Sequence, residues 1–161
     1  MGLSYNLPLH TIRFQIQFVF EIVVMLSKEI SMESRLSLIP ATVDKLRSDP
    51  GLRSRLEGRE LDFYVAVSEA LANAVTHGNR NDPTRKVYVR YTCEPDDELS
   101  IVIRDEGGGF NPGNVAMPED IGEDRNLGIW LMRSCMDEVQ FQNNGTEVYM
   151  RLNSRMRSVY E

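Results

Sequence analysis

Two pairs of alternating segments, each closed by a turn, constrain the fold of this chain more than any other feature. Residues 86–93 and 99–105 alternate apolar and polar side chains on either side of a short acidic turn at 94–98. Residues 139–142 and 146–152 flank Asn143-Asn144-Gly145, and Asn-Gly is a strong hairpin signal. Because helical segments lie between these hairpins, the order predicts an α+β fold. We expect a two-layer α/β sandwich with a mixed, mostly antiparallel sheet and helices on one face.

Length, charge and cysteine content limit the classes of protein. The 161 residues suit one compact domain, with 42% hydrophobic and 26% charged residues. A net charge of −6 argues against a nucleic-acid partner, because phosphate binding requires a basic surface. Cys93 and Cys135 lack metal-ligand spacing, which predicts reduced thiols in a cytoplasmic protein. The predicted domain spans 31–153, between an N-terminal extension (1–30) and a C-terminal tail (154–161).

The N-terminal extension holds the one stretch that suggests a membrane. Residues 12–26 are largely apolar but include Arg13 and Glu21, and they are shorter than the ~20 residues that cross a bilayer. Without a cleavage site after them, a signal peptide is not expected either. Their spacing fits a strand and a helix almost equally well. A translation start at Met25 or Met32 would place the stretch outside the native protein.

The segments before the central helix are short. Residues 31–38 alternate and predict a strand. Pro40 suits the first turn of a helix, which we expect to bury Val43 and Leu46 and to end at Pro50-Gly51.

The central helix, predicted from about Glu60 to His77, combines an apolar face with an unusual polar row. Its predicted core face consists of Leu61, Tyr64, Val65, Ser68, Leu71, Ala72 and Val75. Glu69, Asn73 and His77 are each four residues apart and therefore share one side of the helix. Asn is a poor residue for a helix interior, so the row indicates a functional site.

Two glycine motifs follow the central helix. Asp105 continues the apolar row of the strand over 99–105 and precedes Glu106-Gly107-Gly108-Gly109-Phe110. A long irregular stretch then reaches Asn126, and loops of this length are usually functional or disordered. The helix predicted over 127–136 opens at Gly128, with Leu127, Trp130, Leu131 and Cys135 expected on its buried face. No P-loop, dinucleotide-binding, kinase catalytic-loop or zinc motif occurs.

The three pieces resemble the motifs of one known superfamily. Glu69-Ala-Leu-Ala-Asn73-Ala-Val-Thr-His77-Gly78, Asp105-Glu-Gly107-Gly-Gly109 and Asn126-Leu-Gly128 look like the N-box, the D-x-G-x-G box and the second glycine box of the Bergerat-fold (GHKL) ATPases. The compact N-box and the ending Asn144-Gly-Thr146-Glu-Val-Tyr-Met-Arg-Leu152 are most similar to the bacterial anti-sigma-factor serine/threonine kinases. The resemblance covers residues 31–153 and implies ATP and Mg²⁺ as cofactors.

The resemblance also implies roles for individual residues. Asn73 would bind the Mg²⁺ that bridges the nucleotide phosphates, as a hard oxygen ligand can. Glu69 would be the general base. Asp105 would accept a hydrogen bond from the adenine amino group, with support from Thr146. The remaining residues assigned to the nucleotide are His77, Gly107, Gly109, Arg125, Asn126, Leu127 and Gly128.

Some of these assignments depart from the family pattern. Asn126 replaces the first glycine of the second glycine box, although Asn tolerates left-handed backbone. The expected lid over 111–126 is acidic, with Arg125 as its cation. We expect this lid to be mobile without nucleotide.

The function implied is a cytoplasmic protein-serine kinase. It would phosphorylate a serine on a small antagonist (anti-anti-sigma) protein and sequester a sigma factor, without binding nucleic acid or membrane, and the family's usual dimer allows a homodimer. The alternative is an ATP-binding regulatory module without useful turnover. A sensor histidine kinase would need a phosphoacceptor helix, of which His10-Thr-Ile-Arg13 is only a faint trace.

Overall fold

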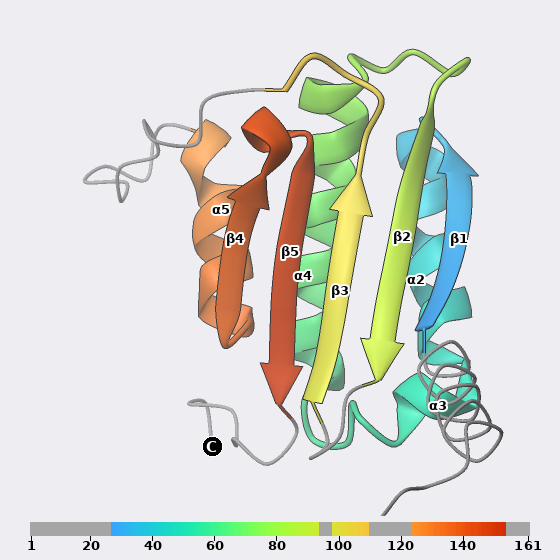
Figure 1. Ribbon diagram of the computed structural model, residues 1–161, viewed down its shortest axis with the longest axis vertical. Helices are drawn as coiled ribbons and strands as arrows, with labels where there is room; N and C mark the ends of the chain where they lie inside the picture. The colour runs from blue at the N-terminus through green and yellow to red at the C-terminus, as the bar shows by residue number, and fades with distance from the viewer. Residues whose placement is uncertain (1–26, 94–97, 110–123, 154–161) are drawn as a thin grey trace, which may run out of the picture.

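A single antiparallel sheet organises the chain. The computed structural model describes residues 27–93, 98–109 and 124–153, so the N-terminal stretch 12–26 and most of the expected lid lie outside the described residues. The strands are β1 (Ser27–Glu33), β2 (Lys86–Cys93), β3 (Glu98–Arg104), β4 (Glu138–Gln142) and β5 (Glu147–Asn153), in the order β1-β2-β3-β5-β4 (Figure 1). All pairings between them are antiparallel. The predicted α+β sandwich and both hairpins are confirmed.

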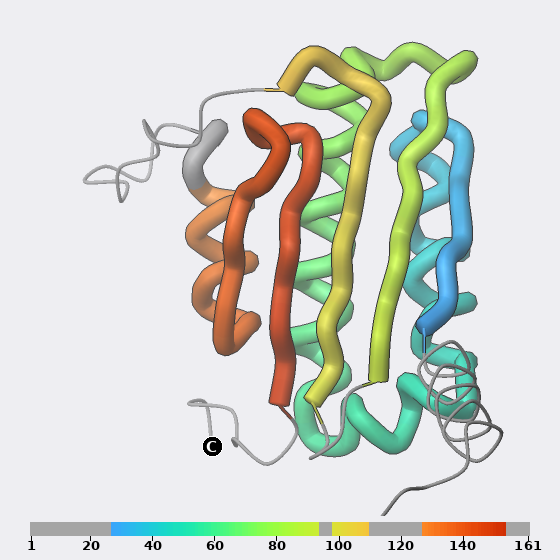
Figure 2. Tube along the Cα trace, in the orientation of Figure 1, coloured from blue at the N-terminus to red at the C-terminus, as the bar shows by residue number. Residues whose placement is uncertain are grey.

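The helices cover one face of this sheet. They are α2 (Ile39–Arg47), α3 (Pro50–Arg53), α4 (Glu60–Asn73) and α5 (Asp124–Cys135), with 3₁₀ turns η1 (Leu36–Leu38) and η5 (Asn143–Gly145) and a π-helical turn, η2 (Ala74–Gly78). The Cα trace shows α4 behind the middle of the sheet, between α2 and α5 (Figure 2). Within the described residues, no helix combines the length and apolarity needed to cross a membrane.

The first strand differs from its prediction over 31–38. Pairing of β1 with β2 runs from Ser27 opposite Thr92 to Glu33 opposite Lys86, where β2 begins. No residue of β2 precedes Lys86, so the chain beyond Glu33 has no partner in β2. It turns into η1 and leaves Leu36 half exposed. The following helix has Pro40 in its first turn and buries Val43 and Leu46, as predicted. It ends at Arg47 and not at Pro50-Gly51, because these two residues begin α3.

The buried faces of α4 and α5 were predicted only in part. Leu71 and Val75 are buried as expected, but Phe63, Ala66, Val67 and Ala70 complete the α4 face and Leu61 is 74% exposed. Among the described side chains of α5, the buried hydrophobic ones are Ile129, Met132 and Cys135, whereas Leu127 and Trp130, which were expected to be buried, are exposed. Apolar residues occur all round both helices, so periodicity alone did not determine which side faces the sheet.

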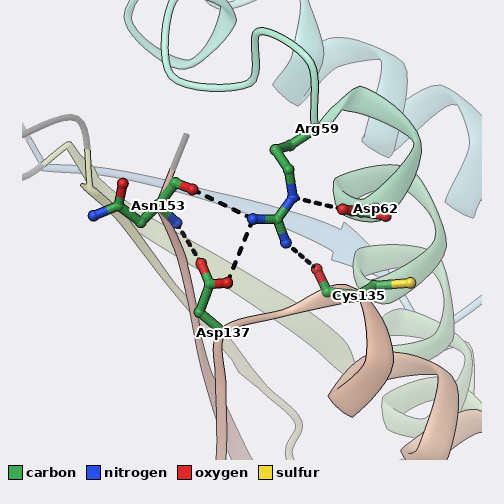
Figure 3. A network of polar contacts seen from close by, with 5 residues as sticks. All are labelled: Arg59, Asp62, Cys135, Asp137 and Asn153. Atoms are coloured by element: carbon green, nitrogen blue, oxygen red, sulfur yellow. Dashed lines mark hydrogen bonds and ion pairs between the residues drawn. The ribbon is translucent and has the colours of Figure 1, made fainter. Parts of the chain in front are cut away.

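A buried arginine joins four elements at one end of the sandwich (Figure 3). Arg59, 6% exposed, precedes α4 and contacts Asp62 in its first turn through Nε. Its other nitrogens donate to the carbonyl of Cys135 at the end of α5 (2.9 Å) and to Asp137 Oδ1 before β4 (3.4 Å). The carbonyl of Asn153, at the end of β5, accepts a further bond (3.3 Å), and Asp137 Oδ2 accepts from the Asn153 N–H (2.6 Å).

Candidate nucleotide site

The predicted site residues gather at the opposite end of the sandwich. The end of α4, the end of β3, the start of α5 and the β4–β5 turn lie together at the top of Figure 1. The helix α4 and the strand β3 end there, and α5 begins there. The three motifs that these elements carry therefore lie together although they are far apart in sequence.

Glu69 and Asn73 face α5 at Gly128. A Cβ atom built on Gly128 would lie 2.7 Å from Glu69 Oε2 and 3.6 Å from Asn73 Nδ2. The spacing of four residues does place both side chains on one side of α4, and that side meets the second glycine motif. The absence of a side chain at Gly128 therefore leaves the room that the Glu69 carboxylate occupies.

The π-helical turn directly after Asn73 changes the end of this row. The backbone N–H of Asn79 donates to the carbonyl of Ala74 at 2.8 Å, five residues earlier, in place of the usual four. His77 lies within this wider turn and is exposed, so the α-helical spacing that predicted its alignment with Asn73 does not continue to it. Turns of this type are frequent at functional sites.

Asp105 is a buried carboxylate enclosed by two glycines. It is 8% exposed, and its Oδ1 accepts a bond from the Gly107 N–H at 2.7 Å. A Cβ on Gly78 would lie 2.3 Å from the Asp105 carboxylate, and one on Gly107 would lie 2.0 Å from the Gly78 carbonyl oxygen. Only glycine fits at either position. Burial is the main influence on the Asp105 pKa and raises it, while the Gly107 N–H and Arg85 oppose this shift.

Thr146 and Gly109 lie beside Asp105. The Asp105 N–H donates to the Thr146 carbonyl at 3.0 Å, which joins the end of β3 to the β4–β5 turn. A Cβ on Gly109, whose φ is +76°, would lie 2.1 Å from the carbonyl oxygen of Asn144 and 3.2 Å from Thr146 Cγ2. The predicted grouping of Asp105, Thr146 and the two glycines is therefore present in the structure.

The chemistry of these groups fits an adenine nucleotide with Mg²⁺. A buried carboxylate needs a donor, and an exocyclic amine supplies one. At Gly107 and Gly109 the space that a Cβ would take is filled by the carbonyl oxygens of Gly78 and Asn144, so these glycines allow the backbone to pack closely around Asp105. Among the described residues no group of three or more His, Cys, Asp or Glu could hold a metal ion. The side-chain oxygen of Asn73 is of a type that fits Mg²⁺, which takes few protein ligands and keeps waters and phosphate oxygens.

The other predicted residues belong to α5, and one important residue was missed. Leu127 is 42% exposed in the first half of α5, while Arg125 and Asn126 are in its first turns with side chains outside the described set. Sequence reasoning assigned Asn79 to a loop. The structure buries it completely, in contact with the turn after Asp105. Its position directly after His77-Gly78 is the one available signal.

Comparison with known proteins identifies the family. The profile of the histidine kinase-like ATPase domain matches residues 40–152. The anti-sigma F factor of Oceanobacillus iheyensis is 36% identical over 110 residues, covering 62% of this chain and 73% of that protein. The serine-protein kinase RsbW of Bacillus subtilis is 34% identical over 92 residues, covering 52% of this chain and 57% of that protein.

The fold comparison agrees with the sequence matches. The histidine kinase domain of the Erythrobacter litoralis blue-light activated histidine kinase gives a TM-score of 0.50 at 16% identity, covering 79% of this chain and 64% of that one. This likeness supports the fold alone. The chain belongs to the family of histidine kinase-like ATPase domains, which implies that it uses ATP and confirms the predicted superfamily. Its relatives include both anti-sigma factors and serine-protein kinases.

Proposed function

We propose that this protein is an ATP-dependent serine/threonine kinase that acts as an anti-sigma factor. It phosphorylates a serine on a small antagonist protein and sequesters a sigma factor. The observation that carries the kinase activity is the Glu69 carboxylate beside Gly128, one helical turn before Asn73. The names of the relatives, anti-sigma F factor and serine-protein kinase, support both halves of the proposal.

The residues divide the work as follows. Asp105 binds the adenine amino group, and Gly107 and Gly109 let the backbone pack closely around this carboxylate. Asn73 would hold Mg²⁺, which supplies charge neutralisation at the phosphates when bound. Glu69 accepts the proton of the attacking serine hydroxyl. Phosphoryl transfer depends mainly on positioning and electrostatic stabilisation, so few side chains are enough.

The partners and the working unit follow from the same proposal. The functional domain is the one predicted over 31–153, together with the residues of β1 from Ser27 onward. It acts in the cytoplasm without nucleic acid, as the family's usual homodimer. Incubating the protein with labelled ATP and candidate antagonist proteins tests the kinase.

The alternative function is an ATP-binding regulatory module. It is favoured by Asn126, which stands where the family pattern has glycine. ATP and sigma-factor binding with no transfer to any antagonist would establish that alternative.

Asn73→Ala is expected to remove the dependence of ATP binding on Mg²⁺. The variant loses the side-chain oxygen that is proposed to bind this ion. We expect ATP affinity in Mg²⁺ to fall by roughly 10–100-fold, the loss typical even of residues that only support metal ligands. Titration calorimetry with and without Mg²⁺ measures this difference. Equal ATP affinity for parent and variant in Mg²⁺ would show that Asn73 does not hold the ion.

Gly128→Ala is expected to reduce phosphoryl transfer through its effect on Glu69. The added methyl group would lie 2.7 Å from Glu69 Oε2, so the carboxylate must move. Misplacement of a catalytic group by about 1 Å can cost roughly 10²-fold in rate. Thermal stability should not fall, because alanine favours a helix more than glycine does.

Gly108→Ala is the matched control for this glycine. A Cβ built there meets nothing within 4 Å, so the variant should keep the parental transfer rate. Adding Gly128→Ala to Glu69→Gln should cause no further loss of transfer. A full additional loss in that double variant would show that Gly128 acts independently of Glu69.

A further inference from the structure

Asn79 has a side chain that is completely buried and hydrogen-bonded at both ends of its amide. Its Nδ2 donates to the carbonyl of Lys86 at 2.9 Å, and its Oδ1 accepts from the N–H of Glu106 at 2.9 Å. The amide therefore uses both its donor and its acceptor to join the start of β2 to the turn after β3. Buried polar groups satisfied in this way fix one arrangement of the backbone.

A third bond closes these contacts into a ring. The N–H of Lys86 donates to Glu106 Oε2 at 2.8 Å, and the hydroxyl of Tyr88 donates to Glu106 Oε1 at 2.9 Å. The ring thus runs from Asn79 to Lys86, from Lys86 to Glu106, and from Glu106 back to Asn79. The backbone of Asn79 is itself held by the carbonyl of Ala74, which connects the ring to the π-helical turn at the end of α4.

The two residues that precede ring members meet in the nucleotide site. Gly78 precedes Asn79, and Asp105 precedes Glu106. A Cβ on Gly78 would be 2.3 Å from the Asp105 carboxylate, so the backbone and the carboxylate are already packed without spare room. Asn79 and Glu106 are the next residues after these two groups. We therefore expect that opening the ring shifts Asp105 relative to α4.

We propose that Asn79 is a positioning residue for base recognition. Its side chain holds the Asp105–Gly107 turn at the distance from α4 at which the carboxylate receives the adenine amino group. The proposal rests on the adenine-binding role proposed for Asp105. An asparagine with a merely structural role would contribute to stability and leave the choice between nucleotides unchanged.

Asn79→Asp is the sharpest test, because aspartate has the same shape but turns a second oxygen toward the Lys86 carbonyl, which opens the ring at its link to β2. The bond that weakens is the one from the adenine amino group to the Asp105 carboxylate. We expect ATP affinity to fall roughly tenfold, the size of one hydrogen bond to a charged group, and the preference for ATP over GTP to fall with it. Calorimetric titration with each nucleotide, well below the unfolding temperature, measures both. Asp137→Asn is the control: it weakens the Arg59 contacts at the far end and should lower the unfolding temperature without changing the ATP-to-GTP ratio.

Glu106→Ala keeps the test valid if Asn79→Asp does not fold. Glu106 is exposed, and its replacement opens the same ring without disturbing the core. It should shift the ATP-to-GTP ratio in the same direction. If the ratio is unchanged in every folded variant of Asn79 and Glu106 while Asp105→Asn lowers it, the inference about Asn79 is wrong.

Asp105→Asn separates this inference from the proposed site. If that variant keeps the parental preference for ATP, Asp105 does not read the base and both assignments fall. If it loses the preference, combining it with Asn79→Asp should cause little further loss, because both act through one carboxylate. Fully additive losses would assign Asn79 an effect that does not pass through Asp105.

Discussion

Glu69→Gln is expected to lower the rate of phosphoryl transfer by roughly 10²–10⁴-fold, the usual contribution of a general base. The amide keeps the shape of the side chain and much of its hydrogen bonding but does not accept a proton. Because Asn73 and Asp105 are unchanged, ATP affinity should stay close to that of the parent. Single-turnover transfer to an antagonist protein, together with calorimetric ATP binding, separates the two effects.

Glu60→Gln provides a matched control for this substitution. Glu60 is an exposed glutamate in the first turn of the same helix, so it undergoes the same chemical change and the same loss of charge. It lies at the end of α4 away from Gly128 and should keep parental transfer. Parental transfer by Glu69→Gln itself would leave Glu69 a structural residue.

Arg59→Met is expected to cause the largest loss of stability, about 3–5 kcal/mol, because it leaves buried charges without their partner. The side chain is 7% exposed and contacts Asp62 and Asp137, which are themselves largely buried. The carbonyls of Cys135 and Asn153 lose a donor at the same time. Denaturant unfolding followed by circular dichroism gives the free energy of unfolding for each variant.

Two further variants sharpen this result. Arg47→Met removes an exposed arginine paired with Asp44, and exposed pairs contribute only about 0–1 kcal/mol. Arg59→Lys keeps the charge but lacks the planar fork that reaches several acceptors, so an intermediate loss is expected. A free energy of unfolding for Arg59→Met equal to that of Arg47→Met would contradict the role assigned to this cluster.

The elements that the sequence predicted best are those with strict alternation. Strand β2 has the predicted bounds, and Asp105 continues the buried row of β3 as expected, because each strand has one face toward the helices. The site motifs lie at the ends of such elements, and the structure brings them to one end of the sandwich. Their roles toward ATP and Mg²⁺ stay predictions.

The features that the sequence did not predict depend on tertiary contacts. Leu61 was expected in the core because apolar residues surround α4. The packing of α4 between α2 and α5 decides which side of this helix faces the sheet. The π-helical turn depends on a bond to Asn79, which is itself fixed by Lys86 and Glu106. No local pattern encodes that ring, since its members are far apart in sequence.

The three consecutive glycines after Glu106 are unequal in their mutational tolerance. At Gly107 and Gly109 a side chain of any kind would overlap a neighbouring carbonyl oxygen, whereas around Gly108 the space is open. Because every other amino acid carries a Cβ, substitutions in this run are tolerated only at its middle position, Gly108. The outer two are constrained by the packing of the backbone itself, so they would stay glycine even in a descendant that kept this fold and had lost phosphoryl transfer.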